Sequence, residues 1–442
     1  MILLIFKIIF MEKQNKNYLL PIVVMFLLYF MIAFVTNFAG SMGSIVKNQF
    51  GVSNALAMLG LAVNFIAYAF MGFPAGLILK RKGYKFTSLA AVAVGLVGVA
   101  IQWISGPAAS FAVYILGAFV AGFSMCMLNV VVNPMLNTLG GGGNRGNQLN
   151  LFGGAINSIG GTLAPILLGY LLGGIAIENA KVPDAAPAMI AAMTIFALAF
   201  LVILFTNIPE PHMETAEEKA ARLSGTQAKD AHSPLSFRHF ILGAVAIFFY
   251  VGAEVGIPFV GKLYMEAPIA KGGLAMSTTL AGALVGAYWF LMMCGRFIGG
   301  AIGGKVSSKM MLSSVAFVAL CLICGIMFIP EESAIDLNWS SINMVGSVPV
   351  KMICMVLCGL CTSVMWGCIF NLSTEGLGKY VPMASGIFMV MVCGGALSFV
   401  QGALADAIGY LGSYIIVMVS FLYILFYALI GSKNVNQDIP VE

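Results

Sequence analysis

The chain has 442 residues, of which 60% are hydrophobic and only 9% are charged. Soluble domains carry about 25% charged residues, so this composition excludes a water-soluble globular protein and indicates a surface in contact with lipid. The formal net charge of +5 is small, and the one-sided distribution of basic residues described below explains it without a nucleic-acid partner.

Apolar segments of membrane-spanning length recur along the whole chain. A helix needs about 20 apolar residues to cross the hydrocarbon core of a bilayer. We predict twelve such spans, with centres near Phe26, Phe65, Val94, Ala118, Ile159, Thr194, Phe249, Tyr288, Phe317, Val356, Val392 and Val419. The predicted fold class is an all-α membrane protein with twelve transmembrane helices in two six-helix bundles.

Basic residues are unevenly divided between the two sides of this predicted bundle. With both termini placed in the cytoplasm, 17 of the 22 Lys and Arg residues, Arg296 among them, fall on cytoplasmic segments and span ends. The opposite face holds only Lys47, Lys181, Lys262, Lys271 and Lys351. Such a bias follows the positive-inside rule. It predicts a multi-pass protein of the cell (inner) membrane with cytoplasmic termini.

Amide side chains mark the fourth and fifth predicted spans. Asn129 and Asn133 are four residues apart on one helix face, and Pro134 leaves a carbonyl one turn earlier without its helical donor. Asn150 and Asn157 share a face of the next span. Amides beside a freed carbonyl suit the hydroxyl groups of a sugar, so we predict a binding role for all four. The alternative is hydrogen bonding between helices.

A polar stretch separates the first six predicted spans from the last six. It runs from Pro209 to His239 and contains all three histidines. We therefore divide the chain into an N-terminal bundle (1–208), a cytoplasmic linker (209–239) and a C-terminal bundle (240–442). The segments NPMLNTLG (133–140) and NLSTEGLG (371–378) echo each other in the two bundles. Duplicated transporters bind substrate near the midplane between their repeats.

The seventh predicted span carries an isolated carboxylate, Glu254. A charge at bilayer depth costs at least about 2.5–3.5 kcal/mol, so such residues usually serve a pathway or a proton. No Asp or Glu lies between Glu12 and Glu178, so the early spans have no acid to share this task. Pro258 frees the carbonyl of Glu254 itself. We assign proton coupling to Glu254, against the alternative of a structural carboxylate.

Three aromatic residues are predicted to contact the apolar C–H faces of a sugar ring. They are Tyr250, Trp289 and Trp366, although aromatic residues in membrane spans more often only pack. The chain contains no nucleophile–base pair, metal-ligand cluster or nucleotide motif, so we expect neither an enzyme nor a cofactor or bound metal. The polar segment 330–347 is expected to be an outward-facing loop.

Several of these segments resemble the fucose/glucose/galactose permease family of the major facilitator superfamily. They include FFYVGAEVGIPF from Phe248, VVVNPMLNTLG from Val130, QLNLFGGAINSIGGTLAP from Gln148 and GRFIGG from Gly295. The resemblance implies alternating access and, usually, proton-coupled uptake of a monosaccharide. The fucose permease pattern has an acid in its first span, where this chain has Ser44 or a close neighbour. It has another acid in its fourth span, where this chain has Asn129. Glu254 resembles the seventh-span acid of the glucose/galactose type.

These observations together predict a secondary transporter that moves a monosaccharide by alternating access and is coupled to protons. Its expected partners are a sugar, a proton and the lipid bilayer, and it is expected to act as a monomer. Two alternatives remain open: an uncoupled facilitator or exporter of another small polar solute, and a sugar sensor that no longer transports.

Overall fold

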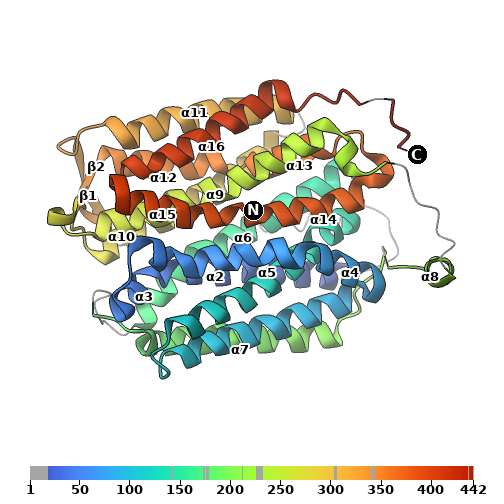
Figure 1. Cartoon of the computed structure of the whole chain (residues 1–442), viewed down its shortest axis with the longest axis horizontal. Coiled ribbons are helices and arrows are strands. Elements are labelled where there is room, and N and C mark those ends of the chain that lie inside the picture. The colour runs from blue at the N-terminus through green and yellow to red at the C-terminus, as the bar shows by residue number, and fades with distance from the viewer. Residues whose placement is uncertain are drawn as a thin grey trace.

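The computed structural model describes residues 18–140, 143–172, 175, 179–211, 213–224, 232–302, 306–339, 344–436 and 438–441. Long helices run side by side along its longest axis in two groups (Figure 1). We call the helices before residue 209 the first half and those after residue 237 the second half. The helices of the first half are α2 (Leu19–Ser41), α3 (Gly43–Phe50), α4 (Asn54–Ser105), α5 (Phe111–Leu139), α6 (Gly143–Leu171) and α7 (Ala186–Phe205).

The second half follows a short helix, α8 (Ala216–Ser224), that lies apart from both groups (Figure 1). Its helices are α9 (Arg238–Glu266), α10 (Thr278–Ile302), α11 (Ser308–Phe328), α12 (Val350–Thr362), α13 (Met365–Thr374), α14 (Val381–Met391), α15 (Leu397–Ile408) and α16 (Ile415–Phe426). A 3₁₀ turn, η6 (Val392–Ala396), joins α14 to α15, and η8 (Tyr427–Gly431) extends α16.

Eleven helical segments of the described chain are long and apolar enough to cross a membrane. One of them, α4, is a single assigned helix that contains two predicted spans. Gly83 breaks it with a φ of +82°, a value that favours glycine, so the chain turns back there. Every predicted span centre lies within a helical segment, and the twelve-helix prediction is confirmed.

The polar segment near residue 340 is not a simple loop. Strand β1 (Ala334–Trp339) pairs with β2 (Met344–Pro349) in an antiparallel hairpin, with Ala334 opposite Pro349. Alternating apolar residues in β1, Ile335 and Leu337, are a weak strand signal that the sequence analysis did not use. The hairpin lies at the end of the molecule opposite α8 (Figure 1). We call these ends the hairpin end and the linker end.

The two halves pack against each other along two seams. On one, α6 contacts α10; on the other, α4 contacts α14, η6 and α15. Glycines allow close approach at these seams: a Cβ atom on Gly395 would lie 2.2 Å from the ring of Phe65 in the other half. The polar side chains described next lie on α2, α4, α5 and α6 of the first half and on α9, α10 and α12 of the second.

Candidate functional site

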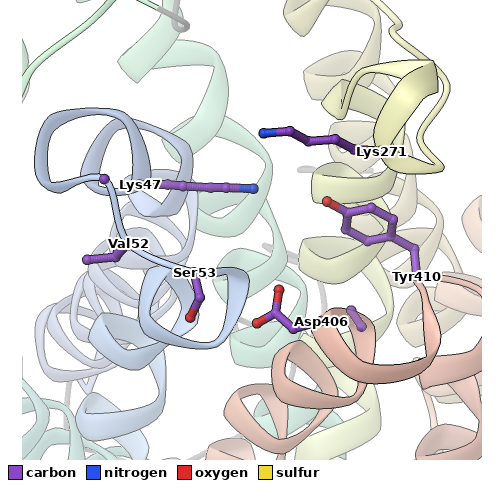
Figure 2. A pocket seen from close by; sticks show the side chains of 8 residues that line it. Lys47, Val52, Ser53, Lys271, Asp406 and Tyr410 are labelled. Carbon is purple, nitrogen blue, oxygen red and sulfur yellow. The ribbon is translucent and has the colours of Figure 1, made fainter.

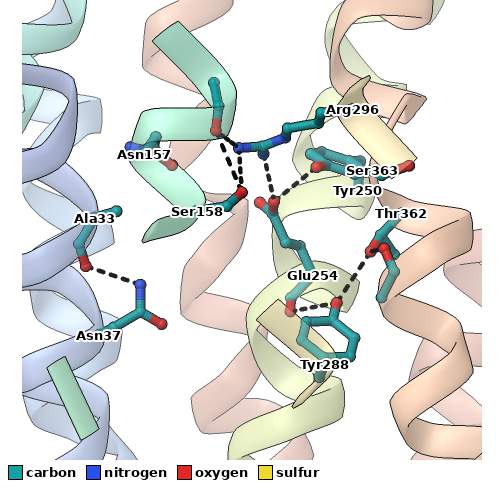
Figure 3. Close-up of polar contacts among 12 residues, drawn as sticks. Ala33, Asn37, Asn157, Ser158, Tyr250, Glu254, Tyr288, Arg296, Thr362 and Ser363 are labelled. Carbon is teal, nitrogen blue, oxygen red and sulfur yellow. Dashed lines mark hydrogen bonds and ion pairs between the residues drawn. The ribbon is translucent and has the colours of Figure 1, made fainter. Parts of the chain in front are cut away.

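Glu254 lies near the middle of α9 and is surrounded by hydrogen-bond donors (Figure 3). Tyr250, one helical turn earlier, donates its hydroxyl to Oε1 of Glu254 at 2.7 Å. Nη2 of Arg296 on α10 lies 3.5 Å from the same oxygen. The Arg296 and Glu254 side chains are only 12% and 15% exposed. The two buried charges stabilise each other, because a buried charge without a partner costs folding free energy.

Arg296 also connects this carboxylate to the first half of the molecule. Its Nη1 atom donates to the hydroxyl of Ser158 at 2.9 Å and to the backbone carbonyl of Gly154, both on α6. The backbone of Gly154 lies close to the arginine; a Cβ there would be in van der Waals contact with Cδ of Arg296 at 3.4 Å. One guanidinium therefore bridges the carboxylate of α9 and the backbone of α6 (Figure 3).

The backbone carbonyl of Glu254 has its own donor. Pro258, four residues later, has no N–H to offer it. The buried hydroxyl of Tyr288 donates to this carbonyl at 3.0 Å and lies 3.2 Å from the hydroxyl of Thr362. The second half thus satisfies both the side chain and the freed carbonyl of Glu254 with phenolic hydroxyls.

A chain of neutral hydrogen bonds occupies the matching region of the first half. Asn129 donates to the hydroxyl of Tyr68 at 2.9 Å, and Asn133 donates to the carbonyl of Asn129 at 2.8 Å. Tyr29 donates to Oδ1 of Asn133 at 2.5 Å, while Asn157 donates to the carbonyl of Tyr29 at 2.9 Å. We call these five residues the amide chain. It joins three of the four predicted amides and links α2, α4, α5 and α6.

Three polar atoms near this boundary are buried and have no hydrogen-bond partner among the described residues. They are Oδ1 of Asn150, Oδ1 of Asn37 and Nε1 of Trp289. Asn37 uses its amide nitrogen on the carbonyl of Ala33 at 2.8 Å, which leaves its oxygen pointing toward Glu254 in Figure 3. Buried polar atoms nearly always have a partner, so these atoms are candidates to contact a solute. Asn37 was missed in the sequence, although it is an amide in an apolar span like Asn129.

The predicted aromatic residues lie around Glu254. The rings of Tyr250 and Trp366 have centroids 6.3 Å apart, and Trp289 packs edge-on against Tyr288 at 5.2 Å. Tyr250 is buried and bonded to Glu254, which limits it to shaping the site, whereas Trp366 is only partly buried. The structure therefore brings the predicted aromatics together in the second half, apart from the amide chain.

Arg296 is the residue that the sequence analysis placed wrongly. It was counted with the basic residues near one membrane surface, but its side chain runs into the protein and pairs with Glu254. The missed signal is physical: ionisable groups inside a membrane pair with one another. An ionised Glu254 inside a span therefore calls for a cation nearby, and Arg296 in the GRFIGG segment is within a few turns of the centre of its helix.

Comparison with known proteins agrees with this architecture. The profile of the Major Facilitator Superfamily matches residues 25–400. The chain therefore belongs to the Major Facilitator Superfamily, and it is a membrane transporter and not an enzyme.

Individual relatives are similar over almost their full length. A glucose/galactose transporter of Brucella abortus (biovar 1, strain 9-941) is 33% identical over 428 residues, which cover 96% of each chain. The crystal structure of the Escherichia coli fucose:proton symporter matches with a TM-score of 0.66 at 20% identity, covering 95% of this chain and all of that one. A proton:xylose symporter structure matches with a TM-score of 0.67 at 13% identity, covering 96% and 94%. At these identities the two structures establish the fold alone.

Proposed function

We propose that this transporter moves a neutral monosaccharide across the cell membrane by alternating access, and that Glu254 couples the movement to a proton. The relatives named as a glucose/galactose transporter and an L-fucose-proton symporter support the substrate class. The observation that carries the coupling is the bond network of Glu254, which reaches α6 of the first half through Arg296.

The network gives protonation a mechanical consequence. When Glu254 is ionised, its charge holds Arg296, and Arg296 holds α6. Protonation of Glu254 removes the charge that attracts the guanidinium, so the bond between α9 and α10 weakens and Arg296 is then held by its bonds to α6. Because alternating access rocks one half against the other, a link across this boundary biases which arrangement is populated.

The hydroxyl groups of a sugar can form hydrogen bonds with side chains that are now bonded to other groups of the protein. The amide chain and the unpartnered atoms of Asn37, Asn150 and Trp289 offer both donors and acceptors. We place the sugar between the amide chain and Glu254, with Trp366 against its apolar face. The linker end is the proposed cytoplasmic side. Residues 1–208 and 240–442 form the two proposed bundles, and residues 209–239 form the linker between them. The proposed functional unit is the monomer.

Uptake by proteoliposomes tests the proposal. Purified protein is reconstituted and given labelled D-glucose, D-galactose, D-xylose or L-fucose, with the outside either acidic or at the internal pH. We expect at least one sugar to accumulate above its external concentration only when the outside is acidic. Equilibration without accumulation would favour the uncoupled facilitator, and no uptake of any sugar would contradict the proposed substrate class.

A further inference from the structure

A polar cavity lies between the two halves, and Glu254 is not among the residues that line it. It has a volume of about 360 Å³ and is at the hairpin end (Figure 2). The first half lines it with Lys47 of α3 and Ser53, which precedes α4. The second half lines it with Lys271 of η3 (Ile269–Lys271), with Asp406 of α15 and with Tyr410.

The charges that line this cavity do not cancel. Lys47 and Lys271 extend toward each other from opposite halves, above the carboxylate of Asp406 (Figure 2). Asp406 supplies the only carboxylate among the lining residues, so the lining carries one excess positive charge. One oxygen of this carboxylate, Oδ2, also accepts from the backbone N–H of Ala55 at the start of α4, at 3.1 Å.

The carboxylate of Glu266 does not line the cavity and is already shared. It lies 3.4 Å from the ammonium of Lys262 and accepts from the hydroxyl of Ser44 at 2.8 Å. Lys262 therefore offsets Glu266, and the cavity lining keeps its one excess positive charge. Lys271 is exposed and Lys47 is half-buried, so the two like charges repel each other through partly hydrated surroundings.

We propose that this cavity binds a phosphate-type oxyanion, held by Lys47 from one half and Lys271 from the other. An ammonium is a compact charge with three donors, and charge-assisted bonds to phosphate oxygens are strong. Tyr410 and Ser53 add neutral hydroxyl groups at the wall. Because each half contributes one lysine, the bound anion stabilises the arrangement in which the hairpin ends are together.

Thermal unfolding of the purified full-length protein tests this site. Inorganic phosphate is titrated from zero to 20 mM at constant ionic strength, with chloride as the balancing anion. We expect a saturable rise in Tm for the wild type, and its loss in Lys47→Gln and in Lys271→Gln. Lys181→Gln is the matched control, because Lys181 is an exposed lysine outside the cavity lining, and it should respond like the wild type.

A fourth variant should change the phosphate affinity in the opposite direction. Asp406→Asn keeps an oxygen for the N–H of Ala55 and removes the negative charge, so phosphate should bind several-fold more tightly than to the wild type. Weaker phosphate binding in this variant would overturn the proposal. Size-exclusion profiles show that each variant is folded before it is compared.

The oxyanion could be free or belong to a lipid headgroup. A parallel arm supplies phosphatidylglycerol in mixed micelles in place of inorganic phosphate, with phosphatidylcholine as the neutral comparison. A response to either phosphate source that requires both Lys47 and Lys271 supports the site and identifies its source. The same Tm in every arm, or responses that survive in Lys47→Gln and Lys271→Gln, would overturn it.

Discussion

The two halves of the transporter bring different chemistry to their common boundary. The first half presents the amide chain, whose groups are all neutral and bonded to one another. The second half presents Glu254 and Arg296, held by the phenols of Tyr250 and Tyr288. Neutral amides can exchange one partner for another at small cost, whereas a buried charge cannot lose its partner cheaply. This difference is the basis on which we propose sugar recognition by the first half and coupling by the second.

The largest effect is expected from Glu254→Gln, which keeps the shape and removes titration. Accumulation driven by a pH gradient should be abolished, while exchange of labelled for unlabelled sugar should remain measurable. Both are read in proteoliposomes. The control is Glu375→Gln, because Glu375 is an exposed acid at the linker end. Accumulation that survives in Glu254→Gln would remove the coupling role from the second half.

Loss of Arg296 should mainly cost stability. Arg296→Gln leaves an ionised Glu254 without a cation, and breaking a buried pair costs up to about 3–5 kcal/mol. Partial exposure of both side chains makes this an upper limit. We expect a clearly lower Tm in detergent, and a partial recovery in the double variant with Glu254→Gln, which measures the coupling between the two sites.

The control for Arg296→Gln is Lys309→Gln, because Lys309 is an exposed basic residue. Its Tm should be unchanged. If Arg296→Gln were as stable as the wild type, neither the pair with Glu254 nor the Arg296 bonds to α6 would contribute to stability, and the contrast between the halves would lose its energetic basis.

A smaller effect is expected from the amide chain. Asn133→Ala removes one neutral hydrogen bond to the proposed sugar, worth about 0.5–1.5 kcal/mol. Sugar affinity should therefore fall several-fold, while gradient-driven accumulation persists at saturating sugar. Equilibrium binding of labelled sugar measures the change. Asn338→Ala on the exposed hairpin strand is the control. Unchanged affinity in a folded Asn133→Ala protein would exclude this residue from the sugar site.

The smallest effect on transport is expected from Tyr288→Phe. It removes the donor to the buried Glu254 carbonyl and should lower stability by about 1–3 kcal/mol, because that acceptor is left unsatisfied, without changing the pH dependence of uptake. Thermal unfolding and uptake at several external pH values test both parts. Tyr170→Phe is the matched control, since Tyr170 is 81% exposed. A shift in the pH dependence would show that the freed carbonyl takes part in coupling.

The residues of the candidate site are easier to predict from the sequence than their partners. Glu254 stands out because it is a lone carboxylate in an apolar span, and Asn133 because amides four residues apart share a helix face. Arg296 has the sequence context of a membrane surface, since a basic residue six positions before the end of α10 is ordinary for an interface. Whether a long side chain turns outward to water or inward to a carboxylate depends on the neighbouring helix, which local sequence does not describe.

The sequence by itself determined the class of protein, the twelve spans and the position of the buried acid, because hydropathy reports the solvent of each segment along the chain. Only the tertiary structure decided that Arg296 joins Glu254 to Ser158, and that Lys47 and Lys271 face each other across one cavity. Those groups are separated by tens to hundreds of residues, and they meet because the glycine-lined seams fix how the two halves pack. The distance between side chains on different helices follows from that packing, and no single segment encodes it.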